Sequence, residues 1–257
     1  MTGMTTADRA AELLRLHQAT EILSLVNCWD VISATTVADV PGTRAIATAS
    51  HAISASHGYP DGEQISVDEM LTAVGRIAAA VDLPVTADLE AGYGDPAETV
   101  RRAIGLGVVG ANLEDQLRPI DEGVAMVTAA LKAAESEGVE FVLNARTDAF
   151  LLAPDRPAEQ SVADAIERGK AYQQAGAQCV FVPGVLSLDV IGELVAALGP
   201  QQVSIMNLPG GPTNRQLQDL GVARVSIGPA GQLLSLAGYA DLARRLNAGG
   251  ALPTPPG

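Results

Sequence analysis

The sequence predicts an α/β fold, a single domain in which eight parallel strands alternate with helices and close into a (β/α)₈ barrel. Short apolar runs rich in β-branched residues alternate with longer helical segments, a pattern typical of a parallel sheet covered by helices. Eight such runs can be counted, and 257 residues is the usual size for eight repeats around one core. The prediction is therefore one barrel of the TIM type over residues 1–257.

The predicted strands are short and mostly apolar. In chain order they are Ile22–Asn27, Arg44–Ala49, Val85–Asp88, Val109–Glu114, Phe141–Arg146, Cys179–Pro183, Val203–Asn207 and Arg224–Ile227. Runs such as Phe141-Val142-Leu143 are continuously apolar, as expected of parallel strands buried on both faces. A doubly wound open sheet is the alternative, but its edge strands would carry polar or charged residues, which none of the eight shows clearly.

The intervening helices carry sequence signals at their ends. Start signals are the capping-box pairs Ser66/Glu69 and Thr213/Gln216, and the run Asp95-Pro96 with Glu98. End signals are the glycines Gly138, Gly176 and Gly221, which suit left-handed caps. Residues 1–20 are predicted to form an N-terminal helical segment, and residues 250–257 a frayed, proline-rich tail. We expect the last helix, about Gln232–Asn247, to pack on its own barrel.

Composition narrows the possible functions. The formal charge of −14 disfavours nucleic acid and anionic membrane surfaces as partners. Met1–Leu16 contains no apolar signal-peptide core, and no stretch of the chain is long and apolar enough to span a bilayer. Cys28 and Cys179 lie far apart and form no disulfide framework, which fits a reducing compartment. These features predict a cytoplasmic protein.

Polar residues gather where the predicted strands end. In a barrel of this kind, reactive groups come from the carboxyl ends of the strands and the loops that follow them. The residues in question are Asn27 to Asp30, Ser50 and His51, Asp88 and Glu90, Glu114 and Asp115, Asn144 to Asp148, and Asn207. Several carboxylates that converge on such a mouth cannot all stay ionised without a compensating cation.

Oxygen ligands favour Mg²⁺, with Mn²⁺ possible, as that cation. No zinc site competes with this interpretation, because His17, His51 and His57 lack zinc-ligand spacing. Arg146 supplies a planar cation suited to a carboxylate or a phosphate, and the ligand is therefore expected to be anionic. The alternative role for Arg146 is an ion pair with Asp148 or Glu114.

A set of motifs, in order along nearly the whole chain, resembles the isocitrate lyase/phosphoenolpyruvate mutase superfamily. The motifs are Asn27-Cys-Trp-Asp-Val-Ile-Ser-Ala34, Gly58-Tyr-Pro-Asp-Gly62, Thr86-Ala-Asp-Leu-Glu-Ala-Gly-Tyr-Gly94, Leu113-Glu-Asp115 and Asn144-Ala-Arg-Thr-Asp148. The resemblance implies a (β/α)₈ barrel that binds Mg²⁺ and a 2-oxo acid or an enolate-like substrate. It also implies a homo-oligomer, a dimer or more usually a tetramer, often with the last helix swapped between neighbours.

The resemblance also implies roles for individual residues. Asp88 matches the most direct metal ligand, and Glu90 and Glu114 match acids that hold the metal mainly through water. Asp61 matches an aspartate near metal and substrate, and Arg146 matches the arginine that grips the substrate. The expected catalytic residues are thus Asp61, Glu114 and Arg146. Less specific matches around the substrate are Trp29, Asp30, Ser50 and Asn207.

One departure from the family pattern directs the prediction of function. Lyases of the family carry a Lys-Lys-Cys-Gly-His type of loop after the fourth strand, whereas this chain has Asp115-Gln-Leu-Arg-Pro-Ile-Asp-Glu-Gly123. The site that stabilises an enolate is kept and the cysteine is absent. We therefore expect Mg²⁺-dependent C–C cleavage or decarboxylation of a small 2-oxo dicarboxylate, with Tyr93, His51 or water as the proton donor.

Two alternatives remain open. The first is a mutase, hydrolase or other phosphate-using barrel enzyme, because the Gly210-Gly211-Pro212 and Gly228–Gly231 loops follow the seventh and eighth strands, where many barrels bind phosphate. No lysine accompanies either loop. The second is a 2-oxo-acid binding protein that has lost catalysis together with the cysteine loop.

Overall fold

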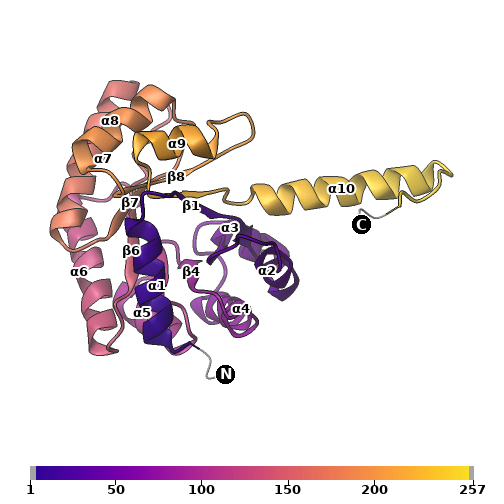
Figure 1. The fold of residues 1–257 in the computed structure, drawn as a ribbon, viewed down its shortest axis with the longest axis horizontal. Coiled ribbons are helices and arrows are strands. Elements are labelled where there is room, and N and C mark those ends of the chain that lie inside the picture. Colours follow the sequence, from indigo (N-terminus) through magenta and orange to yellow (C-terminus); the bar gives the residue numbers. More distant parts are fainter. Residues whose placement is uncertain (1–3, 255–257) are drawn as a thin grey trace.

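The computed structural model describes residues 4–254, and its strands form one parallel barrel (Figure 1). The sheet order is β1-β9-β8-β7-β6-β5-β4-β3-β2, with every pairing parallel. The strands are β1 Leu23–Leu25, β2 Asn27–Cys28, β3 Ile46–Thr48, β4 Val85–Asp88, β5 Gly110–Glu114, β6 Val142–Arg146, β7 Cys179–Val182, β8 Val203–Met206 and β9 Arg224–Ser226. The predicted α/β barrel is confirmed.

The first predicted strand accounts for the ninth strand, because it is interrupted at Val26. Its first half, β1, pairs with β9 through Leu23 and Arg224, and its second half, β2, pairs with β3 through Cys28 and Thr48. The two halves follow each other directly along the chain, so this strand joins the two ends of the sheet and closes the barrel.

Helices connect the strands in the predicted alternation. They are α1 Thr6–Gln18, α2 Val31–Ala38, α3 Ser50–Ser56, α4 Val67–Ala79, α5 Pro96–Gly105, α6 Ile120–Ser136, α7 Ala158–Gln174, α8 Leu188–Leu198, α9 Asn214–Leu220 and α10 Ala230–Asn247. Ser66, Asp95 and Thr213 each accept a hydrogen bond from the backbone N–H three residues on, as predicted. The full capping box is present at Thr213, whereas Glu69 accepts from the Ser66 hydroxyl and not from its backbone N–H. The three predicted terminal glycines all have positive φ.

Helix α1 lies within the predicted N-terminal segment and packs closely on the barrel. Gly110 opens β5, and a Cβ atom there would lie 2.7 Å from both the Leu13 side chain and the Val142 carbonyl oxygen. Glycine is therefore required at this position for α1 to approach the strands. Residues 1–3 lie outside the described part of the chain, as do residues 255–257 of the predicted tail.

The expectation that the last helix packs on its own barrel is wrong. Figure 1 shows α10 projecting away from the barrel, and in the structure only Gln232 of this helix is buried. Four of its five leucines and its tyrosine are exposed, among them Leu234 at 66% and Tyr239 at 73%. These apolar residues are spread around the helix instead of forming one stripe, so the helix has no single face to lay on the barrel. Within residues 4–254, no helix meets the length and apolarity needed to cross a bilayer.

Candidate functional site

A cavity of about 170 Å³ opens at the carboxyl ends of the strands. Its lining includes Ser50, His51, Asp61, Asp88, Asn112 and Arg146. These side chains come from β4, β5, β6, the start of α3 and the segment between α3 and α4. The barrel thus brings together residues that are nearly 100 positions apart, and gives one small cavity both carboxylates and a guanidinium.

Asp88 occupies the last position of β4, where its side chain enters the cavity. One carboxylate oxygen, Oδ2, accepts hydrogen bonds from the Ser50 backbone N–H at 3.1 Å and from the Ser50 hydroxyl at 2.8 Å. The other oxygen, Oδ1, is buried and has no hydrogen-bond partner among residues 4–254. A buried carboxylate oxygen without a donor is costly, which indicates that Asp88 is prepared to bind a cation.

Glu90 lies just beyond β4 in a backbone conformation that is rare for a residue with a side chain, with φ at 51°. Its carboxylate accepts hydrogen bonds from the Tyr93 hydroxyl at 2.9 Å and from the Glu63 backbone N–H. Burial raises the pKa of Glu90 to about 7, against these hydrogen bonds, and the charge of Asp88 raises it further. The acid is therefore held rigidly in a place where its negative charge is poorly solvated.

Glu114 and Arg146 end the neighbouring strands β5 and β6, where they are register partners. Arg146 Nη1 lies 2.6 Å from a Glu114 oxygen, and Arg146 Nε lies 2.7 Å from Asp148 Oδ1. Burial raises the pKa of Glu114 to about 8, although Arg146 opposes this shift, and Asp88 and Glu90 contribute to it. Asp88, Glu90, Glu114 and Arg146 therefore share one electrostatic environment.

Both roles considered for Arg146 are compatible with this geometry. It forms the ion pairs with Glu114 and Asp148, and it also lines the cavity. Burial opposes its charge, but the two carboxylates outweigh this effect and raise the pKa of the guanidinium. Among the described residues, Nη2 has no hydrogen-bond partner and remains available to a ligand.

Asp115 holds the segments around the site in place through hydrogen bonds. No role of its own was predicted for it from the sequence. Its Oδ2 accepts hydrogen bonds from the Tyr172 hydroxyl at 2.7 Å and from Arg168 at 3.1 Å, and its Oδ1 accepts the Asp148 backbone N–H at 3.1 Å. Asp115 therefore ties the loop after β5 to the end of β6 and to α7. Its place in the Leu113-Glu-Asp115 motif, at the end of a predicted strand, was the available signal.

Asn112 is a second residue that sequence reasoning missed, and it lines the cavity directly. Its Oδ1 accepts a hydrogen bond of 2.7 Å from Asn144, whose own Oδ1 is buried without a partner. Asn112 precedes Glu114 by two residues on β5, so the alternation of side chains along a strand was the signal that could have identified it.

Asp61 reaches the rim of the cavity from the segment between α3 and α4. His51 Nδ1 lies 3.3 Å from Asp61 Oδ2, and both side chains are about half exposed. Ser50, which precedes His51, is buried and bonds Asp88, so the predicted residues Ser50, Asp61 and Asp88 belong to one continuous set.

Trp29 and Asp30 do not reach this cavity. Asp30 caps helix α2, accepting a 2.7 Å hydrogen bond from the Ser33 backbone N–H. Together with Val26, Ile32 and Val37, both residues line a separate groove of about 330 Å³ beside the start of α10. Their expected role in binding substrate stays a prediction.

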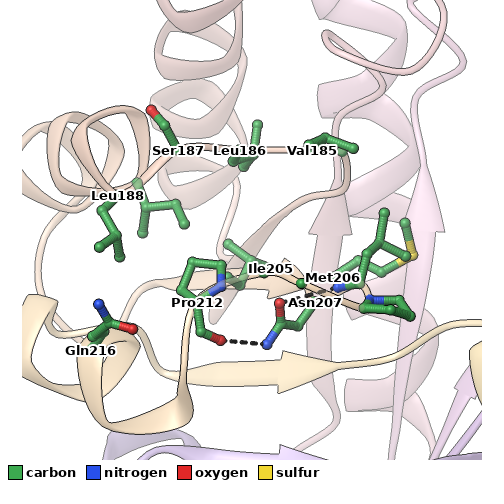
Figure 2. A pocket seen from close by; sticks show the side chains of 15 residues that line it. Val185, Leu186, Ser187, Leu188, Ile205, Met206, Asn207, Pro212 and Gln216 are labelled. Carbon is green, nitrogen blue, oxygen red and sulfur yellow. Dashed lines mark hydrogen bonds between the residues drawn. The ribbon is translucent and has the colours of Figure 1, made fainter.

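Asn207 lies in another cavity, of about 540 Å³, between the loops after β7 and β8 (Figure 2). Its Nδ2 donates to the Pro212 carbonyl at 2.8 Å, and its Oδ1 accepts from the Leu208 N–H. The amide therefore shapes the loop that contains Gly210 and Gly211. None of the described residues that line this cavity is ionisable, whereas the smaller cavity has carboxylates and a guanidinium, so the smaller cavity is the candidate site.

The residues present fit a divalent cation held mainly by one direct ligand. Among residues 4–254, no three His, Cys, Asp or Glu side chains lie close enough together to hold a metal ion between them. The unpartnered Asp88 oxygen can serve as that ligand, and a cation beside it would favour the ionised forms of Glu90 and Glu114, whose pKa values are raised. Such a site suits Mg²⁺, which binds through few carboxylates and keeps several waters.

The loop after β9 offers little to a phosphate. Asn27 Oδ1 accepts the backbone N–H groups of Ile227 at 3.0 Å and of Gly228 at 2.9 Å. Because these amides are occupied by a side chain, they are not free to cradle an anion, as a phosphate loop requires.

Known proteins resemble most of this chain in sequence and in fold. The sequence profile of the family described as phosphoenolpyruvate phosphomutase matches residues 13–247. The oxaloacetate decarboxylase of Rhodopseudomonas palustris is 31% identical over 202 residues, which cover 76% of this chain and 69% of that protein.

Two solved structures share the barrel closely. A crystal structure of a Burkholderia cenocepacia protein is 41% identical, with a TM-score of 0.87, and the match covers 92% of this chain and 99% of that one. The structure of an oxaloacetate acetylhydrolase in complex with its product oxalate is 26% identical, with a TM-score of 0.86, covering 97% of this chain and 90% of that one.

Proposed function

Because the chain belongs to the isocitrate lyase/phosphoenolpyruvate mutase superfamily, we propose that it is a Mg²⁺-dependent carbon–carbon lyase that cleaves or decarboxylates a small 2-oxo dicarboxylate such as oxaloacetate. The observation that carries the proposal is the meeting of Asp88 and Arg146 in one cavity. The carboxylate suits a hard cation, and the guanidinium suits the carboxylate of the substrate.

Some residues of the cavity would bind the substrate, and others would hold the metal that stabilises developing negative charge. Arg146 receives a substrate carboxylate through Nη2 while Glu114 and Asp148 fix its plane. Ser50 orients Asp88 by two hydrogen bonds, and the uncharged polar side chain of Asn112 lines the cavity. Mg²⁺ at Asp88 would stabilise the negative charge that develops on the 2-oxo group when the C–C bond breaks.

Protonation of the resulting carbanion needs a donor at the cavity. The Tyr93 hydroxyl already donates to Glu90, and burial raises its pKa, so it is a poor acid. His51 lines the cavity and contacts Asp61, which makes this pair the better placed source of a proton. The loop from Asp115 to Pro119 is short and contains neither cysteine nor histidine, so it supplies no acid of the kind that the family's longer lyase loop carries.

A panel of 2-oxo acids tests the proposed activity. We expect turnover of oxaloacetate or a 4-substituted relative in the presence of Mg²⁺, measured as release of the 2-oxo monoacid above the metal-only background. After dialysis against a chelator, activity should disappear and should return when Mg²⁺ is added. Absence of enzyme-dependent turnover on the whole panel would contradict the proposal, and tight oxalate binding without turnover would favour a catalytically silent binder.

We further propose that the protein is a homo-oligomer, a dimer or a tetramer, assembled through α10. The exposed leucines of this helix and the apolar groove lined by Trp29 and Ile32 are surfaces that a second copy of the chain would cover. Replacing Leu234 and Leu236 together by glutamate should convert the oligomer to a monomer in light scattering coupled to gel filtration. Val185→Glu is the control, because Val185 is 90% exposed on a loop far from α10 in sequence. A variant that keeps its mass would contradict this assembly.

A further inference from the structure

Arg224 is a fully buried arginine inside the barrel that the proposed function does not use. It begins β9, where it is the register partner of Leu23 on β1 and of Ser204 on β8. Its side chain is 1% exposed and reaches across the barrel to β4, where Nη1 donates to the Thr86 hydroxyl at 3.3 Å. Within the part of the chain that the structure describes, Nε has no hydrogen-bond partner and no carboxylate lies within ion-pair distance of the guanidinium.

An unpaired charge in this position is one of the least favourable features that a core can contain. Burial lowers the pKa of Arg224 to about 10, so the guanidinium still carries its charge at neutral pH. The neighbouring groups do not neutralise it. Burial raises the pKa of the Cys179 thiol to about 12 and, together with the charge of Arg224, lowers the pKa of His17 to about 3. Both side chains are therefore neutral, and neither provides a negative charge that would stabilise the guanidinium.

The carboxylate of Asp88, on the same strand as Thr86, accounts for a buried cation at this place. Thr86 precedes Asp88 by two residues on β4, so both side chains lie on the same face of the strand. The cation therefore lies beneath the carboxylate that faces the cavity, and Asp88 is the carboxylate whose charge acts on Arg224. Arg224 does not line the cavity itself, so any influence on a ligand acts through space and through Asp88.

We infer that Arg224 is the buried counter-charge of the candidate site, a positioning residue that makes the site prefer a divalent cation together with an anionic ligand over the cation alone. The inference rests on the proposed function, because it concerns the same cavity. A positive charge under Asp88 repels the incoming cation and attracts the anion that accompanies it. Acting through an interior of effective dielectric constant about 20, one charge changes each affinity by roughly tenfold, in opposite directions.

The test is the neutral variant Arg224→Met, with Arg224→Lys as the charge-conserving control. The binding of Mn²⁺ alone, and of oxalate at saturating Mn²⁺, is measured by titration calorimetry. In Arg224→Met, Mn²⁺ should bind roughly tenfold more tightly and oxalate roughly tenfold more weakly than in the wild type. Arg224→Lys should bind both probes nearly as the wild type does. The melting temperature of Arg224→Met should be equal or higher, because an apolar side chain replaces an unpaired buried charge.

Changes of opposite sign in the Mn²⁺ and oxalate affinities distinguish this role of Arg224 from a purely structural one. If the residue only supported the fold, its removal would lower the melting temperature and weaken both probes or neither, and this outcome would overturn the inference. Arg224→Gln provides a second neutral variant, and failure of both neutral variants to fold would show that the charge serves the fold. A wild-type protein that binds neither Mn²⁺ nor oxalate would refute the proposed function as well, whereas variants that match a binding wild type would refute only this inference.

Discussion

Replacing Asp88 by asparagine should lower kcat/KM for the 2-oxo acid by about 10³-fold or more in the presence of Mg²⁺. A bound metal contributes several kcal/mol of charge stabilisation, and each factor of ten in rate corresponds to about 1.4 kcal/mol. Asparagine keeps the size of the side chain and can still accept the hydrogen bonds from Ser50, but it lacks the charge that attracts the cation. The loss should therefore come from metal binding and not from the fold, and Mn²⁺ titration should show it directly.

Asp95→Asn is the matched control for this substitution. Asp95 caps α5 at the surface, and asparagine caps a helix about as well as aspartate. Its activity and its melting temperature should equal those of the wild type. Full metal-dependent activity in Asp88→Asn would show that the metal ligand has been assigned to the wrong residue.

Replacing Arg146 by lysine should lower kcat/KM by roughly 10²-fold, mainly through a higher KM. Lysine keeps the charge but loses the planar fork that can contact Glu114, Asp148 and a ligand at the same time. Losing one charge-assisted hydrogen bond of this kind costs about 1.5–3 kcal/mol, which corresponds to one to two factors of ten. Steady-state kinetics and oxalate titration measure the loss independently.

The same variant separates the two roles of Arg146. If the arginine serves only the ion pairs, Arg146→Lys should lose stability while keeping its oxalate affinity. If it also binds substrate, oxalate affinity should fall at temperatures where the variant is fully folded. Arg101→Lys, on an exposed pair with Glu98 of the same helix, is the control, because exposed pairs of this type contribute little.

Much of the fold could be predicted because its signals are local. The apolar runs became strands, and Thr213 with Gln216 formed the reciprocal cap that their spacing predicted. The interruption of the first strand at Val26 was not predicted, because it arises where that strand changes partners from β9 to β3. The direction of α10 was predicted wrongly, because its apolar residues are spread around the helix and give it no single face to lay on the barrel.

The candidate site was predictable to the same extent. Asp88, Glu114 and Arg146 end parallel strands, and the carboxyl ends of parallel strands meet at one end of a barrel. Asn207 also follows a strand, yet its amide bonds its own loop and lines another cavity. The position of a residue at a strand end therefore predicts which end of the barrel it occupies, but not the direction of its side chain.

The sequence by itself determined the alternation of eight apolar runs with helices, the helix caps and the position of the acidic residues at strand ends. Each of these features depends only on residues a few positions apart in the chain. Only the tertiary structure decided that Arg146 pairs with both Glu114 and Asp148, that Asp88 keeps one oxygen without a donor, and that Arg224 lies beneath it. The contact between Arg224 and Thr86 joins residues 138 positions apart. Such contacts exist only once the barrel has closed, because closure brings opposite strands within reach of one side chain and removes water from between them.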